Sequence, residues 1–195
     1  MAITDFLERN AKLYPAETSL VEINPANQPD HAMTWREYNL IEATSTEKYR
    51  REMTWKEFDV KANRFANLLL TRGIRKGDKV AILLMNCIEW LPNYFGILKT
   101  GALAVPMNYR YTSDEIKYCL ELAEVNTLIF GPEFIGRIEQ AFDHLRGVKT
   151  FFYVGQGLPT FADSYGTLVQ YCSSTAPAVE LNDGDDAAIY FSSGT

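Results

Sequence analysis

The residues best suited to chemistry are the last four of the chain, Ser192-Ser193-Gly194-Thr195. They follow residues 187–191, an apolar and β-prone run that predicts a strand. Glycine lets a backbone approach a ligand closely, and hydroxyl and N–H groups donate hydrogen bonds to anionic oxygens. A strand that leads into such a turn favours phosphate binding. We therefore expect the chain to be the front part of a longer enzyme, cut inside its phosphate loop.

Two other glycine patterns are weaker candidates for phosphate or nucleotide binding. Gly131 and Gly136 have the spacing of a P-loop, but Arg137 stands in the place of the lysine. Ile138 stands where a hydroxyl would hold Mg²⁺, so the pattern lacks the groups that the chemistry needs. The pair at 155 and 157 begins a dinucleotide fingerprint but has no third glycine in place.

The sequence gives little support for a metal site or a histidine-based catalytic triad. His31 and His144 are isolated, with no ligand spacing around them. A zinc site or a histidine-based triad needs several such side chains in a set pattern. The aspartates at 183, 185 and 186 lie among Asn and Gly, which indicates a solvated turn. We therefore expect no metal ligand in this chain.

Composition describes one ordinary globular domain of 195 residues, 47% hydrophobic and 23% charged. A net charge of -6, without clustered Lys and Arg, argues against nucleic-acid binding. Cys87, Cys119 and Cys172 are widely spaced, which is typical of buried small hydrophobes in a reduced compartment. A reactive or metal-binding thiol is the alternative interpretation.

The chain shows neither a secretory signal nor a membrane span. Residues 1–14 have no apolar core. The longest apolar stretch, residues 81–107, is interrupted by Asn86, Glu89, Asn93 and Lys99, so it lacks the ~20 apolar residues that a span needs. We therefore expect no integral membrane span and a cytoplasmic location.

Strands and helices alternate along most of the chain, which predicts an α/β fold with a mainly parallel sheet and helices on both faces. In such sheets ligands bind beyond the carboxyl ends of the strands. The predicted strands cover residues 20–23, 80–84, 102–106, 127–130, 150–154 and 187–191. The predicted helices cover residues 4–13, 54–73, 89–100, 112–123, 134–145 and 161–171.

A short repeat interrupts this alternation. Residues 33–38, Met-Thr-Trp-Arg-Glu-Tyr, return as Met-Thr-Trp-Lys-Glu-Phe at 53–58. Both copies carry the Thr-x-x-Glu capping box that starts a helix, as does Thr112 with Glu115. The second copy leads a strongly amphipathic helix, and the first a more polar one. We interpret residues 24–52 as a loop or insertion that holds a local duplication without chemistry of its own.

Several segments in order resemble the adenylate-forming superfamily, which contains acyl-CoA synthetases, luciferases and the adenylation domains of peptide synthetases. The end of the chain resembles the opening of that superfamily's phosphate-loop signature. Asn108-Tyr109-Arg110 resembles the Asn-Pro-Arg that is frequent in CoA ligases, although Tyr109 stands where proline is usual. The remaining matching segments are residues 53–58 with 62–66, Gly77-Asp78-Lys79-Val80-Ala81, and residues 98–108, Leu-Lys-Thr-Gly-Ala-Leu-Ala-Val-Pro-Met-Asn.

The resemblance implies an acyl-CoA synthetase that uses ATP, CoA, Mg²⁺ and a carboxylic acid. It implies that residues 1–195 are the N-terminal part of the AMP-binding domain. It implies that Ser192, Ser193, Gly194 and Thr195 bind the ATP phosphates. It also implies that Arg110 contacts a phosphate of the CoA nucleotide. In the family, the Mg²⁺ carboxylate and the catalytic lysine come later in the chain, so we expect residues 1–195 alone to be inactive.

Several alternatives stay open at this point. The chain could be a standalone flavodoxin-like binding module, or belong to the luciferase or peptide-synthetase branch. Arg110 could be a surface side chain paired with Asp114 or Glu115. The identity of the acid is open, as is the oligomeric state, for which a homodimer is one option.

Overall fold

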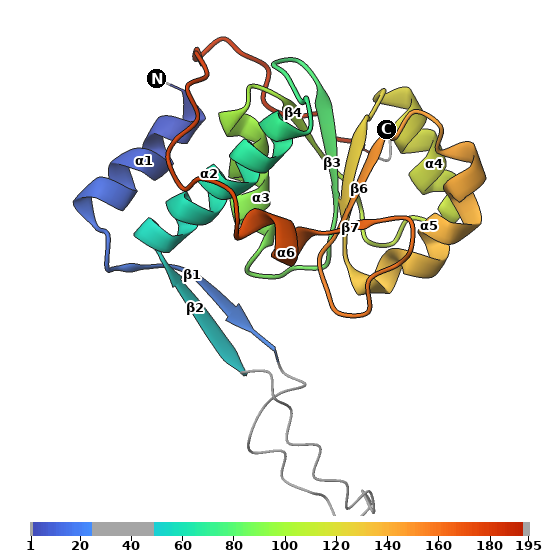
Figure 1. Ribbon diagram of the computed structural model, residues 1–195, viewed down its shortest axis with the longest axis horizontal. Helices are drawn as coiled ribbons and strands as arrows, with labels where there is room; N and C mark the ends of the chain where they lie inside the picture. The colour runs from blue at the N-terminus through green and yellow to red at the C-terminus, as the bar shows by residue number, and fades with distance from the viewer. Residues whose placement is uncertain (1, 25–48, 193–195) are drawn as a thin grey trace, which may run out of the picture.

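The computed structural model describes residues 2–24 and 49–192, and its centre is a five-stranded parallel sheet (Figure 1). The strands lie in the order β4-β3-β5-β6-β7, and each pairs in parallel with its neighbours. Their bounds are β3 Lys79–Leu83, β4 Leu103–Pro106, β5 Thr127–Phe130, β6 Thr150–Tyr153 and β7 Asp163–Ser164. The predicted α/β class is confirmed.

Helices cover both faces of this sheet (Figure 1). Helices α4 and α5 lie on one face, and α1, α2, α3 and α6 lie on the other. The bounds are α1 Ile3–Leu13, α2 Trp55–Thr71, α3 Trp90–Lys99, α4 Ser113–Leu122, α5 Ile135–Ala141 and α6 Tyr165–Val169. Short 3₁₀ turns, Pro132–Phe134 and Phe142–His144, flank α5 where a single helix was predicted over 134–145.

Alternate side chains of each strand enter two different cores. Ala81 and Leu83 pack with the cluster under α4 and α5, whereas Val80 and Ile82 pack with the cluster under α2 and α3. All four are fully buried. A parallel strand that is covered on both faces needs an apolar residue at every position, which explains the continuous apolar runs in the sequence.

Side-chain caps begin two of these helices as the sequence predicts. Thr54 Oγ1 accepts the Glu57 N–H at 3.2 Å, and the Glu57 carboxylate accepts the Thr54 N–H at 2.8 Å. Thr112 and Glu115 make the same reciprocal pair at the start of α4. Each pair satisfies backbone donors that the first helical turn leaves free.

A separate hairpin joins β1, Thr18–Ile23, to β2, Arg50–Thr54, with Ile23 opposite Arg50. The prediction of a loop over 24–52 is therefore wrong for residues 50–52, which belong to β2. Their charged sequence, Arg-Arg-Glu, lacks the apolar alternation that identifies a strand. The rest of that predicted insertion, residues 25–48, lies outside the described residues and includes the first copy of the repeat.

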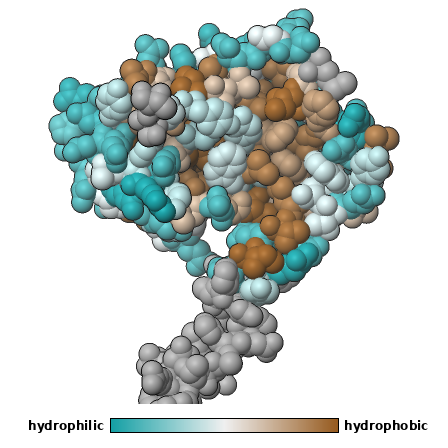
Figure 2. Space-filling model, turned by 180° about the vertical axis from the view of Figure 1, so that it is seen from behind, coloured by the Kyte–Doolittle hydropathy of each residue, from teal (hydrophilic) through white to brown (hydrophobic). Residues whose placement is uncertain are grey.

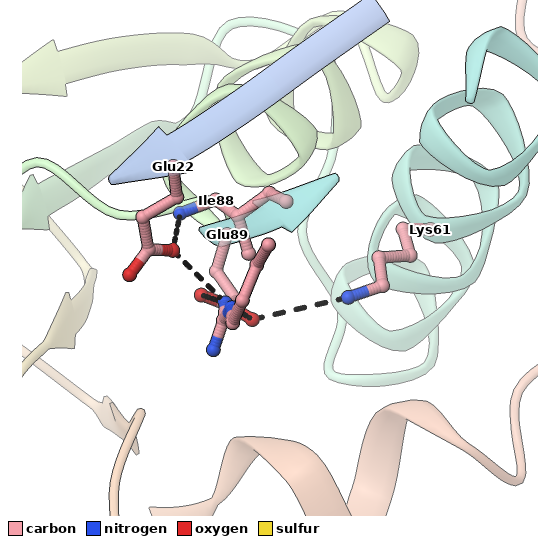
Figure 3. A network of polar contacts seen from close by, with 5 residues as sticks. Glu22, Lys61, Ile88 and Glu89 are labelled. Carbon is pink, nitrogen blue, oxygen red and sulfur yellow. Dashed lines mark hydrogen bonds and ion pairs between the residues drawn. The ribbon is translucent and has the colours of Figure 1, made fainter. Parts of the chain in front are cut away.

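An ion-pair network attaches the hairpin to the loop before α3 (Figure 3). Arg51 Nη2 lies 2.8 and 2.9 Å from the two carboxylate oxygens of Glu89, and 3.1 Å from Glu22 Oε2. Glu22 also accepts the Ile88 N–H at 2.8 Å, and Lys61 lies 3.9 Å from Glu89. The network therefore joins β1, β2, α2 and the loop that enters α3.

The prediction of a sixth strand over 187–191 is wrong, because this segment forms only a single parallel bridge, Ala188 with Ala104 of β4. Ala104 N–H donates to Ala187 O, and Ile189 N–H donates to Ala104 O. Since residues 104 and 106 point their backbone groups to the same side of β4, the next donor toward this segment would belong to Pro106. Proline has no N–H, so the ladder stops there.

The predicted helix over 161–171 is also shorter than expected. Asp163 and Ser164 form β7 beside β6, and α6 covers only Tyr165–Val169. Ser164 accepts the Thr167 N–H at 3.3 Å and so starts this helix late. The segment between α6 and residue 187 contains no helix or strand.

Helix α4 ends in a Schellman motif with an unusual residue. Glu124 has a positive φ of 53°, its N–H donates to Glu121 O, and Val125 N–H donates to Leu120 O. This position favours glycine, because a Cβ raises the energy of the left-handed conformation. The Glu124 side chain is 82% exposed and lies 3.5 Å from Lys79, an ion pair of the kind that contributes little.

We expect Glu124→Gly to raise the free energy of unfolding by about 0.5–1 kcal/mol, because it relieves the left-handed strain. The matched control is Glu121→Gly within the last turn of α4, which should lower the free energy of unfolding by about 0.5–1 kcal/mol. Urea denaturation measures both changes. A loss of stability of equal size in the two variants would contradict this explanation.

Candidate functional site

The carboxyl ends of the parallel strands meet at one edge of the sheet, and the candidate residues gather there. Ala188 pairs in parallel with Ala104, so Ser192 and Asn108 each follow that bridge by four residues. Both residues therefore leave the sheet at the same edge, and both are exposed. Ser192 is the last residue that the structure describes, and the predicted phosphate ligands Ser193, Gly194 and Thr195 lie outside the described residues.

Arg110 lies in an ordered turn at this edge. Asn108 Oδ1 accepts the Arg110 N–H at 2.9 Å. The Arg110 guanidinium lies 5.4 Å from the centre of the Tyr109 ring, and its Nε donates to the Tyr109 hydroxyl at 3.1 Å. Within the described part of the chain, no ion pair joins Arg110 to an acidic side chain. Its exposed guanidinium therefore keeps donors for an anionic ligand.

Asp114 and Glu115 are the acidic side chains that could pair with Arg110 on the surface. The Glu115 carboxylate is engaged by Thr112 in the capping box of α4, and these hydrogen bonds lower the pKa of Glu115. Asp114 is exposed in the first turn of the same helix. Neither is paired with Arg110 in the structure, which weakens the interpretation of Arg110 as half of a surface ion pair.

Arg137, the residue that stands in place of a P-loop lysine, supports the Arg110 turn. Its Nη1 donates to Tyr109 O at 2.7 Å and to Tyr111 O at 3.1 Å, on either side of Arg110. The Arg137 guanidinium also lies 5.5 Å from the centre of the Phe134 ring. Sequence reasoning treated this arginine as a defect in a phosphate motif and missed its positioning role, for which the sequence offers no local signal.

A polar depression of about 500 Å³ lies between α4 and α5 and includes Arg137 in its lining. Lys117 and His144 also line it, and Asp114 contributes the one carboxylate among the lining residues. Ser113 and Gln140 cross it with a 2.8 Å hydrogen bond. In a chain with a net charge of -6, this local excess of cationic and neutral donors suits an anionic ligand.

The cysteines carry no chemistry in this arrangement. Cys119 is buried, and Cys87 and Cys172 are half-buried. Burial raises the pKa of the Cys87 thiol to about 11 and raises the pKa of the other two thiols. All three therefore stay protonated near neutral pH, which agrees with the predicted role as small hydrophobes.

The described residues, 2–24 and 49–192, contain no group of three side chains suited to hold a metal ion. None of the helices in these ranges is long and apolar enough to cross a bilayer. The face opposite that of Figure 1 carries a band of apolar residues that runs from the hairpin across the molecule (Figure 2). Exposed apolar bands of this kind are typical of surfaces that contact protein, membrane or ligands.

The parallel sheet places Ser192 and the Arg110 turn beyond its carboxyl ends, which is where α/β sheets bind ligands. The model of the AMP-binding enzyme family matches residues 7–195, and the chain belongs to that family. The resemblance that the sequence predicts is thereby confirmed.

Individual relatives are CoA ligases. The chain is 35% identical over 159 residues to a crotonobetaine/carnitine–CoA ligase of Salmonella agona, which covers 77% of this chain and 30% of that protein. It is 30% identical over 139 residues to a medium/long-chain-fatty-acid–CoA/3-oxocholest-4-en-26-oate–CoA ligase of Mycolicibacterium smegmatis, covering 69% of this chain and 25% of that one. The chain therefore spans less than a third of the length of these relatives.

Solved structures show the same fold. The anthranilate CoA ligase AuaEII in complex with anthranoyl-AMP matches with a TM-score of 0.82 and 26% identity, over 100% of this chain and 32% of that one. The inhibitor-bound N-terminal domain of FACL13 from Mycobacterium tuberculosis matches with a TM-score of 0.77 and 25% identity, over 100% of this chain and 42% of that one. The chain is thus similar to the N-terminal part of acyl-CoA synthetases.

Proposed function

We propose that this chain forms the N-terminal part of an ATP-dependent acyl-CoA synthetase. The observation that carries the proposal is the parallel bridge between Ala188 and Ala104, which sends Ser192 and the Arg110 turn to the same edge of the sheet. Family membership and the names of the relatives support the CoA-ligase branch over luciferases and peptide-synthetase adenylation domains.

The proposed reaction has two steps. The carboxylate of an acid attacks the α-phosphorus of ATP, which gives an acyl-adenylate and releases pyrophosphate. The thiol of CoA then attacks the acyl carbonyl, which forms a thioester and releases AMP. The adenylate bound to the anthranilate ligase supports an intermediate of this kind.

This chain contributes donors to the first step. We assign Ser192, Ser193, Gly194 and Thr195 to the ATP phosphates, where N–H and hydroxyl groups stabilise the charge on the departing pyrophosphate. The family resemblance implies Mg²⁺, but no group in the described residues indicates this metal. We therefore assign none of these residues to the metal. The apolar band in Figure 2 is a suitable surface for the further chain that the longer relatives contain.

We assign Arg110 to a phosphate of the CoA nucleotide. Its turn is held at both flanking carbonyls by Arg137, so the guanidinium is presented from a fixed backbone. The depression lined by Lys117 and Arg137 adjoins this turn through Arg137 and supplies further positive charge. A guanidinium is well suited to phosphate because its donors form a planar fork.

In the complete enzyme, we expect Arg110→Ala to raise the KM for CoA about tenfold, since one charge-assisted hydrogen bond is lost. Acid-dependent exchange of pyrophosphate into ATP should stay within a factor of about two, because that half-reaction does not involve CoA. The control is Arg9→Ala on α1, which removes an arginine that also lies 5.4 Å from its own aromatic partner, Phe6. Equal KM values for CoA in both variants would refute the assignment of Arg110.

Residues 1–195 alone should not bind ATP below millimolar concentrations, because the lysine and the nucleoside site of the family lie beyond them. Calorimetry tests this expectation. Micromolar binding by residues 1–195 would instead support a standalone binding module.

In the complete enzyme, Gly194→Val should slow pyrophosphate exchange by obstructing the close approach of the backbone to phosphate, and unaltered exchange would contradict the role of this glycine.

A further inference from the structure

The segment that carries Ser192 is weakly attached along the sheet. Two backbone hydrogen bonds, of 3.0 and 2.9 Å, join Ala187 and Ile189 to Ala104, and Pro106 ends the ladder. Side chains add to these bonds: Ile189 and Phe191 pack against the cluster under α4 and α5, Ala187 and Ala188 pack against the cluster under α2 and α3, and the Tyr190 hydroxyl lies 3.2 Å from that of Tyr94. A slip of two residues would displace Ser192 by about 7 Å, which is far beyond hydrogen-bonding distance. A further anchor comes from the loop that precedes the segment.

A lysine from the far side of β4 holds the loop immediately before this segment. Lys76 Nζ lies 2.5 Å from Asp185 Oδ2 and donates to Glu180 O at 3.2 Å. Asp185 also accepts the Asn182 N–H at 2.8 Å, while its own N–H donates to Asn182 O. The hydrogen bond from Lys76 is the main cause that lowers the pKa of the Asp185 carboxyl. The loop is thus closed and anchored two residues before Ala187.

The turn that enters β4 leaves space for this lysine. Gly101 has a φ of +73°, and a Cβ at this position would lie 2.8 Å from Cγ and 3.1 Å from Cβ of Lys76. Gly77 N–H, next to Lys76 in the chain, donates to Gly101 O at 2.9 Å. The stem of Lys76 therefore crosses the start of β4, and its ammonium reaches the loop on the other side. The contact therefore links the loop before residue 187 to the turn before β3, which is itself hydrogen-bonded to Gly101 at the start of β4.

We propose that Lys76 is a positioning residue that, through Asp185, fixes the register of residues 187–191 on β4 and so the point at which Ser192 leaves the sheet. Among the described residues, Lys76 forms its hydrogen bonds and ion pair with Glu180 and Asp185 and not with Ser192 or Arg110, so it acts through the loop. The contact between Lys76 and Asp185 is part of the observed structure. The statement that the positioned turn holds ATP phosphates rests on the proposed function.

Hydrogen exchange on the 195-residue chain tests the contact without any assay of activity. In Lys76→Met, which keeps the stem and removes the charge, we expect the Ile189 amide to exchange about fivefold faster than in the unmodified chain, the size of effect that a partly exposed ion pair supports. The amides of β3 should be unchanged. The control is Lys79→Met, which removes the lysine paired with Glu124 and should leave Ile189 unaffected. Unchanged exchange at Ile189 in Lys76→Met would overturn the proposal.

Kinetics of the complete enzyme test the consequence for ATP. Lys76→Met should raise the KM for ATP about fivefold in pyrophosphate exchange, with the KM for CoA and the melting temperature close to those of Lys79→Met. A purely structural lysine would not show this split between the KM values for ATP and CoA.

The outcomes separate the two proposals. Absence of acid-dependent exchange in the unmodified enzyme would refute the proposed function and leave the contact to be judged by Ile189. An active enzyme in which Lys76→Met accelerates exchange at Ile189 but leaves the KM for ATP unchanged would overturn the positioning role alone.

Discussion

Parallel pairing of β3, β4, β5 and β6 is the constraint on which the rest of the structure depends. In this arrangement every strand runs the same way, so all the carboxyl ends meet at one edge. Both faces of the sheet are covered by helices, and Val80, Ala81, Ile82 and Leu83 are all fully buried. The central positions of these strands hold no exposed polar group, and polar chemistry is therefore confined to the strand ends and the residues beyond them.

Three basic side chains illustrate how the fold uses charge at the two opposite edges of the sheet. Arg137 holds the backbone on either side of Arg110, and Lys76 holds the loop before residue 187. Arg110 itself makes contacts only with its immediate neighbours in the described part of the chain, Asn108 and Tyr109. Two cations thus fix backbone, and the third is presented to a ligand. The net negative charge of the chain gives no indication of this local arrangement of basic side chains.

The elements with strong local signals could be predicted from the sequence. Strand β5 was predicted at its observed bounds because a threonine and three apolar residues lie between turn residues, and Thr54 and Thr112 start their helices because the capping box is a local contact. The family could likewise be identified, since several motifs occur in the right order. These features depend on residues a few positions apart.

Features that depend on distant partners could not be predicted. Residues 187–191 read as a strand, but Pro106, some eighty positions earlier, ends their pairing. The role of Arg137 depends on carbonyls 26 and 28 residues away, and that of Lys76 on a carboxylate 109 residues away. The same is true of β2, whose Arg51 is fixed by Glu22 and Glu89 (Figure 3). In each case the residue that decides the structure lies far away in the sequence, so no local pattern identifies the contact.

The most direct test of the central claim is to identify the products that the complete enzyme forms from ATP, CoA and a panel of carboxylic acids. Mass spectrometry of the acyl-CoA, together with chromatography of the nucleotides, measures both products in one reaction. Our account predicts that AMP and acyl-CoA appear in equal amounts, with pyrophosphate as the other product. Formation of acyl-CoA with ADP and inorganic phosphate, or release of AMP without any thioester across the panel, would contradict it.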